Sequence, residues 1–495
     1  MTFSKRLITG TLIAALSLVA ATAAFATPDP GTATSNAVVQ NQGTTTANVV
    51  VSYYAQDGTA ALTTEATINA GAVAEFKTAD TALASGFAGA AIVSSDQPLA
   101  AIVSLKNSDV SASKGGITQG AYNATTAPAS DISFPSVWGF AGIGSVSTIQ
   151  NTSSDATVLT VDFFNRAGDN LGSRTINLNG YGSVTIDMGN ASDLPSGFPT
   201  DFSDGSISVS SSATDIAGAS TAYWTNRQGA YQALTSANAG TTLYAPSHFA
   251  FKSNASDPDY ALFSALNIQN TTGTAAPITI EYFTRGDTSG NAALSLTCTV
   301  PANSAVGLNV KNGGSGCGLN AASFAPLGTS WSGSVKVVST DNINLVGTGI
   351  TSWGNNGYGG MYAMVTTNDA SDTIYIPAQY RRQPGGSWAQ WSAINLQNIG
   401  SSTVAAADIT IKYIDTAGNT VVTLTGSQLP GDLAAGAAFG LNTRNGGDLD
   451  ASAFNSLGDS WIGGILVEGP AGSQLVAVNN IVYSNRASVY NGIPQ

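Results

Sequence analysis

Charged residues are scarce in this sequence. Asp, Glu, Lys and Arg make up 9% of its 495 residues, whereas about 25% is usual in a soluble protein. The charge is also one-sided, because 30 Asp and Glu stand against 17 Lys and Arg and give a net charge of -13. Such a chain cannot neutralise a phosphate backbone and is repelled by an anionic membrane surface. We therefore expect no nucleic-acid partner.

Residues that support acid–base, thiol or zinc chemistry are also few. The sequence has one His and two Cys, and it lacks the His-Glu-x-x-His, Gly-x-Ser-x-Gly and Gly-Lys-Ser/Thr signatures. A glycosidase needs only two carboxylates, but most Asp residues stand beside Gly, Asn or Ser in predicted turns, where they cap the backbone. His248 closely follows Pro246 and is expected to be solvated at a junction between domains. The sequence thus predicts that the protein is not an enzyme.

Residues 1–26 have the three parts of a secretory signal peptide. Lys5 and Arg6 precede an apolar run, and the run ends on the small-residue sequence Ala24-Phe25-Ala26. We expect cleavage after Ala26, which leaves a mature chain of about 469 residues with 15 basic and 30 acidic side chains. No stretch of 18 apolar residues follows. We therefore expect a secreted protein, extracellular or on the cell surface, without a membrane span.

Cys298 and Cys317 are the two cysteines, and a glycine-rich loop separates them. In an oxidising compartment such a pair most simply forms a disulfide. A thiolate nucleophile or a metal pair is the alternative, but no His or third Cys lies near them in the sequence. We expect a disulfide that stabilises the fold by about 3 kcal/mol through the entropy of the closed loop.

A Gln-Asn pair recurs four times along the chain, at spacings of 110, 119 and 128 residues. The copies are Gln40-Asn41, Gln150-Asn151, Gln269-Asn270 and Gln397-Asn398. After each pair, apolar residues alternate with others and end on an aromatic, and this period of two predicts a half-buried β-strand. The four series are Val49, Val51, Tyr53; Leu159, Val161, Phe163; Ile278, Ile280, Tyr282; and Ile409, Ile411, Tyr413.

Each copy closes on a strand with a tyrosine, and the next copy opens on an aromatic residue followed by proline. The closing tyrosines are Tyr122, Tyr231, Tyr362 and Tyr490, and the openings are Phe134-Pro135, Tyr244-Ala245-Pro246 and Tyr375-Ile376-Pro377. These marks divide the chain into the signal, 1–26, and four domains, which we call repeats 1 to 4: 27–130, 131–242, 243–372 and 373–495. Internal duplication explains them best.

The rhythm of the repeats indicates the fold class. About seven short strands in ~115 residues, with turns every 8 to 12 residues, are typical of an immunoglobulin-like sandwich. A β-propeller also repeats short strands, but this period is far longer than one blade. We predict an all-β protein of four tandem immunoglobulin-like antiparallel β-sandwiches in an elongated array, a rod of about 140 Å.

The mature chain resembles bacterial secreted proteins that are built of tandem immunoglobulin-like modules. The resemblance lies in the Gln-Asn pairs, in paired-aromatic strands and in closing Tyr-Asn pairs. Examples are Tyr53-Tyr54, Phe163-Phe164, Tyr122-Asn123 and Tyr490-Asn491. The resemblance covers nearly everything after residue 34 and implies the sandwich fold and an exported, cell-surface location. It implies no catalytic residues.

Repeat 1 departs from the others at its start. The predicted cleavage site lies so close to Gln40 that the first strand of this repeat is short or missing. A missing edge strand invites pairing with a strand of another chain. Truncated end repeats are also the ordinary caps of an array, so both readings stay open.

Aromatic residues are the strongest candidates for binding, because exposed rings stack on sugars or fill partner pockets. Trp331 and Trp461 occupy equivalent positions just before a strand and are expected in the core. Trp391 and Phe263 match each other in a shared run and are expected to point inward. The remaining candidates for a contact patch, with packing at an inter-domain hinge as the alternative, are Tyr380, Arg381, Arg382 and Trp388.

No cofactor is expected, and calcium is the one candidate ion. Asp257-Pro258-Asp259 and Asp448-Leu449-Asp450 each place two carboxylates on a loop. Calcium takes six or more oxygens, and no full ligand ladder accompanies either pair.

The sequence predicts a non-catalytic structural or adhesive protein of the cell surface. Its expected partners are cell-surface components, polysaccharide or further copies of the same chain. An array of carbohydrate-binding modules that uses exposed aromatics is the alternative function.

Overall fold

The structure is a computed structural model that describes residues 16–18, 33–107, 118–140, 143–224, 227–252, 260–354, 357–483 and 486–495. In these ranges β-strands predominate, and the helical segments are 3-10 turns of three to seven residues. The predicted all-β class is confirmed. None of the helices in the described ranges is long and apolar enough to cross a membrane.

The strands of repeat 1 form two four-stranded antiparallel sheets, in the orders β1-β6-β3-β4 and β5-β2-β7-β8. One hydrophobic cluster takes side chains from both sheets, among them Val51 and Tyr53 of β3 and Val39 of β2. The elements are β1 Leu16–Leu18, β2 Ala33–Asn41, β3 Ala47–Ala55, β4 Ala60–Ile68, β5 Val73–Lys77, η1 Thr78–Asp80, β6 Gly89–Ser95, β7 Leu99–Asn107 and β8 Thr118–Asn123.

Repeats 2, 3 and 4 have the same strand order and add a first strand that joins the two sheets. In repeat 2 the order is β12-β11-β14-β9-β10-β15-β16, with β13 on β10. The elements of repeat 2 are β9 Asp131–Phe140, β10 Ile143–Asn151, β11 Thr157–Asn165, β12 Asn170–Leu178, β13 Ser183–Asp187, η2 Ala191–Asp193, β14 Asp204–Ser211, β15 Ile216–Trp224, β16 Arg227–Gln232, β17 Leu234–Thr235 and η3 Ser236–Asn238.

The elements of repeats 3 and 4 follow the same plan. Those of repeat 3 are β18 Thr242–Lys252, β19 Tyr260–Asn270, β20 Ala276–Thr284, β21 Leu294–Val300, β22 Ala305–Asn309, β23 Gly313–Ser315, η4 Ala321–Leu327, β24 Ser330–Ser339, β25 Leu345–Trp353, β26 Tyr358–Ala363 and η5 Thr367–Asp369. Those of repeat 4 are β27 Thr373–Arg382, η6 Pro384–Gly386, β28 Gln390–Asn398, η7 Ala406–Asp408, β29 Thr410–Asp415, β30 Thr420–Thr425, η8 Gly426–Gln428, β31 Ala438–Asn442, β32 Gly446–Gly447, η9 Ala451–Leu457, β33 Ser460–Glu468, β34 Leu475–Tyr483, β35 Arg486–Asn491 and β36 Ile493–Pro494.

The strand order differs from that of an immunoglobulin domain, in which the sixth and seventh strands pair with each other. Here the sixth strand of repeat 2, β14, pairs with the first, β9, and the seventh strand, β15, pairs with the second, β10. The register of each first strand shifts at its proline, as between Ala245 and His248 of β18. Proline cannot donate to the ladder, so the bulge lets one strand pass from one sheet to the other.

The asparagine of each Gln-Asn pair holds the turn that follows its strand. Asn41 Nδ2 donates to Thr45 O at 2.7 Å and to Ile68 O at 2.9 Å, and Asn41 Oδ1 accepts from Gly43 N at 2.8 Å. Asn151 and Asn398 make the corresponding three bonds. The motif is therefore structural, because a buried side chain satisfies backbone groups that the turn leaves unpaired.

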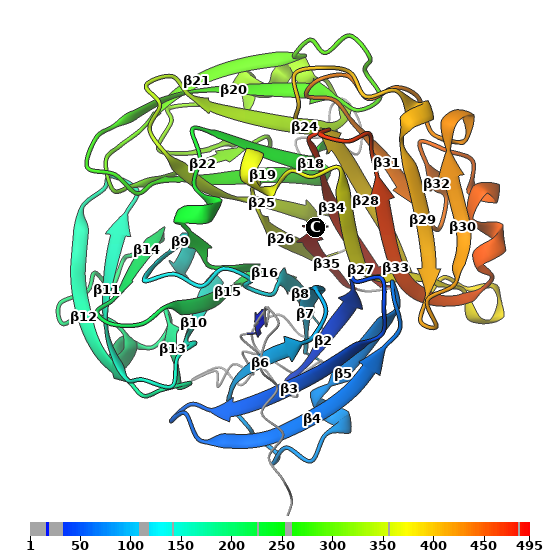
Figure 1. Ribbon diagram of the computed structural model, residues 1–495. Coiled ribbons are helices and arrows are strands. Elements are labelled where there is room, and N and C mark those ends of the chain that lie inside the picture. The colour runs from blue at the N-terminus through cyan, green and yellow to red at the C-terminus, as the bar shows by residue number, and fades with distance from the viewer. Residues whose placement is uncertain are drawn as a thin grey trace, which may run out of the picture.

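The four repeats lie around a common axis, and this arrangement overturns the predicted elongated rod (Figure 1). The closing strands line the axis: β8 contacts β16, β16 contacts β26, β26 contacts β35, and β35 returns to β8. Repeats 1 and 4 therefore touch, and Asn123 Nδ2 donates to Asn491 O at 2.8 Å while Asn491 N donates to Asn123 Oδ1 at 2.9 Å. The chain forms a closed ring.

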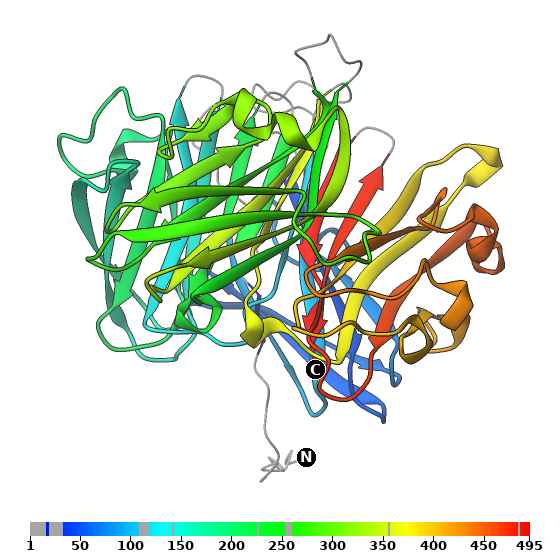
Figure 2. The same cartoon turned by 90° about the horizontal axis from the view of Figure 1, so that it is seen from above.

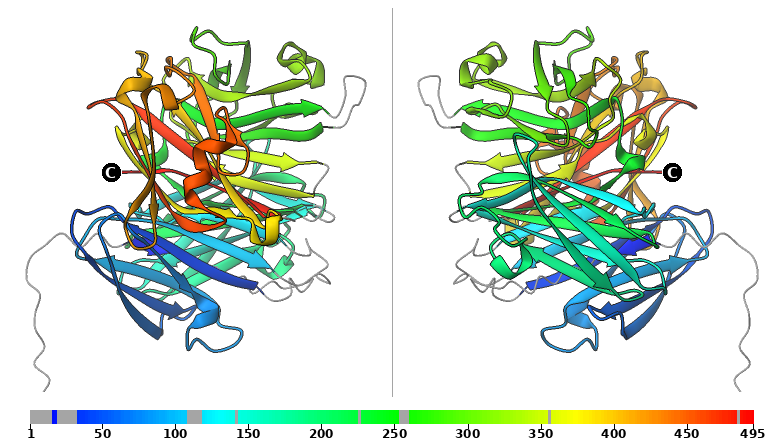
Figure 3. Two further views of the ribbon diagram at one scale, coloured as in Figure 1. Left: turned by 90° about the vertical axis from the view of Figure 1, so that its right-hand side faces the viewer. Right: turned by 90° about the vertical axis from the view of Figure 1, so that its left-hand side faces the viewer.

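The ring closes because the same loop makes each junction. The turn after the paired-aromatic strand of each repeat reaches the next repeat. One hydrogen bond from each junction is Ser183 N to Gln56 O at 3.0 Å, Ser304 Oγ to Arg166 O at 2.7 Å, Gly286 N to Ala438 O at 2.9 Å and Asn69 Nδ2 to Ala417 O at 3.3 Å. Figure 2 shows the ring edge-on, and Figure 3 shows the blue strands of repeat 1 beside the orange and red strands of repeat 4.

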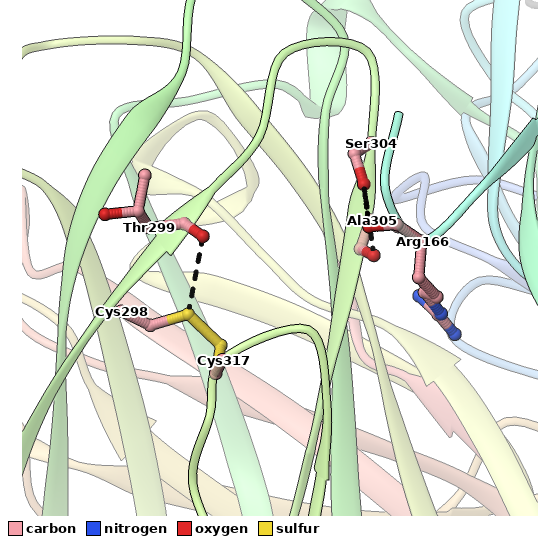
Figure 4. The surroundings of a disulfide bond; sticks show 6 residues. All are labelled: Arg166, Cys298, Thr299, Ser304, Ala305 and Cys317. Atoms are coloured by element: carbon pink, nitrogen blue, oxygen red, sulfur yellow. Dashed lines mark hydrogen bonds between the residues drawn. A yellow bond between two sulfur atoms is a disulfide. The ribbon is translucent and has the colours of Figure 1, made fainter. Parts of the chain in front are cut away.

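The predicted disulfide is present in repeat 3. Cys298 lies on β21, and Cys317 lies in the loop that follows β23, with a Cα–Cα distance of 5.3 Å (Figure 4). The bond ties the outermost strand of the sheet to a glycine-rich loop, so it restrains two segments that the core holds from one side only.

Candidate binding grooves

Two grooves of similar size lie where neighbouring repeats meet. Groove 3/4, between repeats 3 and 4, has a volume of about 410 Å³, and groove 2/3, between repeats 2 and 3, has about 430 Å³. The aromatic and polar lining of groove 3/4 comprises Phe249, Trp353, Tyr358, Trp391, Arg285, Asn395, Asn442, Arg444, Asn445 and Asn480. That of groove 2/3 includes Trp138, Trp224, Phe263, Asp204, Asn267, Asn309, Asn312, Ser315 and Ser352.

The two grooves are copies of one site. Their walls come from the first and seventh strands of one repeat and from the second strand and a glycine turn of the next. The matching pairs are Trp138 and Phe249, Trp224 and Trp353, Phe263 and Trp391, Asn267 and Asn395, and Asn312 and Asn445. A ligand that fits one groove therefore meets similar chemistry in the other.

Groove 3/4 combines aromatic rings with polar and charged side chains. The rings of Trp353 and Tyr358 lie 6.2 Å apart, and both side chains are partly exposed. The Arg444 guanidinium lies 4.5 Å from the centre of the Trp391 ring, an arrangement that favours a cation–π interaction. Arg285 is fixed at the rim, because its Nη2 lies 2.8 Å from Asp448 Oδ1 of the next repeat.

Groove 2/3 has the same kinds of side chain as groove 3/4, but they make different contacts. The Trp138 and Trp224 rings meet edge to face at 5.4 Å, and Lys311 Nζ lies 5.7 Å from the centre of the Phe263 ring. Arg166 is the counterpart of Arg285. It donates from Nε to Asp204 Oδ2 at 3.0 Å and from Nη2 to Asn267 Oδ1 at 2.9 Å. These bonds hold the groove wall in place across the junction.

The patch predicted from the sequence lies in repeat 4 and contributes no residue to these described linings, although Trp388 contacts Trp391 of groove 3/4. Tyr380 is 7% exposed and donates its hydroxyl to Glu75 Oε1 of repeat 1 at 3.0 Å. Arg381, also 7% exposed, pairs with Asp459 at 3.0 Å and lies 5.4 Å from the Trp388 ring. Arg382 is exposed and Trp388 is partly exposed. Tyr380 thus packs at a junction, whereas Trp388 and Arg382 reach solvent.

Two of the expectations for tryptophans are met and one is wrong. Trp331 and Trp461 are buried, at 5% and 6% exposure. Trp391 and Phe263 are partly exposed and line the grooves instead of pointing inward. The sequence did contain a sign of these sites, since Phe263 and Trp391 each stand four residues before a matched asparagine. Only the structure shows that each aromatic and its asparagine line one groove.

His248 is buried, not solvated as the sequence suggested. It is 1% exposed beside the rings of Tyr282 and Trp331, at centroid distances of 5.7 and 6.2 Å. Burial lowers the pKa of its imidazole from 6.5 to about 3, because the charged form would lose its hydration. A neutral ring inside the core is not placed to exchange protons with a substrate in either groove.

The candidate calcium ligands have other roles where the structure describes them. Asp448 accepts hydrogen bonds from Arg285 and from Gly440 N, and Asp450 caps η9 through Ser452 N at 2.8 Å. Asp257-Pro258-Asp259 lies outside the described residues. Within the described ranges, no group of three or more His, Cys, Asp or Glu side chains is arranged to hold a metal ion.

Comparisons with known proteins do not assign this chain to a family. No protein-family model matches the chain, and no curated protein matches its sequence. Among solved structures, the chain is similar to the crystal structure of Thermotoga maritima 1070, with 11% sequence identity and a TM-score of 0.19. The similarity covers 24% of this chain and 97% of the other. At this score, the similarity says nothing about function.

Proposed function

We propose that the protein is an exported, non-catalytic adhesive protein of the cell surface that binds polysaccharide in its junction grooves. The observation that carries the proposal is the pair of equivalent grooves, each lined by three or more aromatic rings together with asparagine side chains. A sugar ring offers C–H groups to an aromatic face and hydroxyls to amides, which both donate and accept hydrogen bonds.

The charges around the grooves support a neutral ligand. Arg285 and Arg166 are already paired with Asp448 and Asp204, so Arg444, which lies over the Trp391 ring, is the one further charged side chain in the described lining of groove 3/4. The described lining of groove 3/4 includes no carboxylate, and Asp204 is the one carboxylate of the described lining of groove 2/3. A glycosidase places two carboxylates about 5 to 10 Å apart, so these linings favour retention of a glycan over its hydrolysis.

The ring geometry supports binding to a polymer. We propose that each repeat is a β-sandwich module of immunoglobulin-like size and altered strand order, and that the predicted boundaries 27–130, 131–242, 243–372 and 373–495 delimit these modules. Two similar grooves on one rigid body contact one polysaccharide chain, or two neighbouring chains, at once. Weak contacts then add through effective concentration, which suits attachment to a repetitive surface.

Alanine at Trp353 and Trp391 should release the protein from its polysaccharide. We expect retention of residues 27–495 on immobilised cellulose, chitin, xylan or a glycan array, and at least a tenfold loss in the double variant, since an interface loses most of its affinity with its buried aromatics. Trp224→Ala with Phe263→Ala tests groove 2/3 in the same way. The four substitutions together should abolish retention, because no second groove remains to supply avidity.

Two further variants sharpen this test. Tyr54→Ala removes a partly exposed aromatic outside both described linings and should leave retention unchanged. Trp388→Ala removes the predicted patch and should have a smaller effect than the groove variants, because Trp388 meets Trp391 edge to face at 6.3 Å but is absent from the described lining. If the parent protein is retained on no glycan, or if the four-site variant is retained equally, the proposed function is wrong.

A further inference from the structure

Among the described residues of repeat 1, from Ala33 onward, no strand takes the place of the first strand that the other repeats share. In repeats 2, 3 and 4 the strands β9, β18 and β27 pair with β14, β24 and β33. In repeat 1 the equivalent place beside β6 is taken by β1, three residues of the predicted signal peptide. Leu16 stands opposite Val93, and Leu18 stands opposite Ala91. The edge of β6 is therefore filled by a segment that we expect export to remove.

The expected mature chain lacks the residues that correspond to the part of the first strand opposite Ala91 and Val93. Gln150 follows Gln40 by 110 residues, so Ile132 and Phe134 of β9 correspond to positions 22 and 24. Both positions precede the expected cleavage site after Ala26. Of the residues between this site and β2, those at positions 27 and 28 correspond to Val137 and Trp138, which pair with the first two residues of β14, and those at 29 and 30 correspond to the end of β9, which pairs with the second strand.

The other repeats bury this first strand deeply. Ile132, Phe134 and Val137 are 2%, 0% and 0% exposed and belong to the core of repeat 2. On β6 the corresponding neighbours are Ala91 and Val93, both 0% exposed in the core of repeat 1. Loss of β1 leaves one row of backbone donors and acceptors of β6 without a partner strand, and such an edge pairs readily with another strand.

We propose that the edge of β6 in the mature protein is a strand-acceptor site that binds an extended segment of a partner protein by β-strand addition. The segment runs antiparallel to β6 and carries apolar residues at alternate positions, as β1 and the first strands of the other repeats do. It needs no charge, since β6 is uncharged from Gly89 to Ser95. A second copy of this chain is a poor donor, because its own first strands are already paired inside its ring.

The first strand of repeat 2 provides a probe. A labelled peptide with the sequence of Asp131–Phe140 is titrated into the protein of residues 27–495, and binding is followed by fluorescence anisotropy and by the shift in melting temperature. We expect saturable binding and a rise in melting temperature. The same peptide with Ile132→Asp and Phe134→Asp should bind at least about 100-fold more weakly, because it would bury two carboxylates without partners.

A variant that carries its own donor strand separates strand addition from other binding. The sequence of Asp131–Phe140 is placed directly before Gly31, the position that corresponds to the turn after β9. We expect this variant to melt at a higher temperature than residues 27–495 and to bind no peptide, because the edge of β6 is filled within the chain.

Each remaining outcome decides against the proposal. Equal binding of the Asp-substituted peptide, or binding retained by the variant with its own donor strand, would show that the peptide binds elsewhere. If N-terminal sequencing finds Leu16–Leu18 on the exported protein, β1 stays paired with the edge of β6 and leaves no site for a partner strand. A dimer of residues 27–495 that the added strand abolishes would make a second copy the occupant in place of a separate partner.

Discussion

Leucine at Gly360 is expected to destabilise the ring by at least about 3 kcal/mol, the upper end of the usual effect of overpacking. Gly360 lies on β26 at the central axis, and a Cβ built there would stand 2.3 Å from Val489 Cγ2 and 3.0 Å from Val489 N. Val489 belongs to β35 of the next repeat and is 0% exposed. The added side chain therefore cannot be accommodated unless two axial strands separate.

The residue at this position is small in every repeat, and this explains why we expect a leucine there to destabilise the protein strongly. The residues two before each closing tyrosine are Gly120, Gly229, Gly360 and Ser488. Close packing of four strands around one axis leaves no room for a larger group. The measurement is the denaturation midpoint in guanidinium chloride, together with the hydrodynamic radius, which should increase if the ring opens.

Gly273 provides the matched control. It lies in an exposed turn of repeat 3, and a Cβ built there meets nothing within 4 Å. Gly273→Leu should leave the free energy of unfolding within about 0.5 kcal/mol of that of the parent protein, as most surface substitutions do. Equal midpoints for the two leucine variants would contradict the tight axial packing.

Valine at His248 is expected to make the protein more resistant to acid, by about 3 kcal/mol at pH 4 relative to pH 7. The pKa of His248 is about 3 in the folded protein and 6.5 as the ordinary value. The unfolded chain therefore binds the proton more readily, and the parent protein loses stability as the pH falls from 6.5 toward 3. A valine has no such proton to bind.

Another repeat of this protein already has valine at the position that is equivalent to His248. Val137 holds the equivalent position in repeat 2, two residues after the proline, and is 0% exposed. Denaturation midpoints of His248→Val and of the parent protein are measured at pH 7, 5 and 4, and only the pH-dependent part of their difference is compared, because the cavity left by the smaller side chain is the same at each pH. A difference that stays constant with pH would show that the imidazole is not buried in the neutral form.

Much of the local structure could be predicted from the sequence, because alternate burial leaves a direct pattern along a strand. Val49, Val51 and Tyr53 are 1%, 0% and 2% exposed, as their spacing indicates. The Gln-Asn pairs mark four equivalent turns, and the two cysteines form the expected disulfide. These features depend on neighbours within one repeat, so a single repeat carries the information for them.

The grooves and His248 could not be predicted in the same way. Trp353 and Trp391 lie 38 residues apart in two different repeats and meet only because those repeats pack at a fixed angle. His248 looks like a junction residue beside Pro246, yet the bulge at that proline turns its side chain into the core. The predicted patch around Trp388 rested on sequence proximity, which does not show that Tyr380 is covered by repeat 1.

By itself, the sequence determined the all-β class, the fourfold repetition, the alternation of buried and exposed residues and the disulfide, because each is written in short-range spacing. Only the tertiary structure decided that the repeats close into a ring, that two of the described junctions form equivalent grooves and that β1 pairs with the edge of β6. The physical reason is that the packing angle between repeats is set by many small contacts at the axis and at the junction loops. Each of these contacts joins residues of different repeats, so the short-range spacing within one repeat does not specify it.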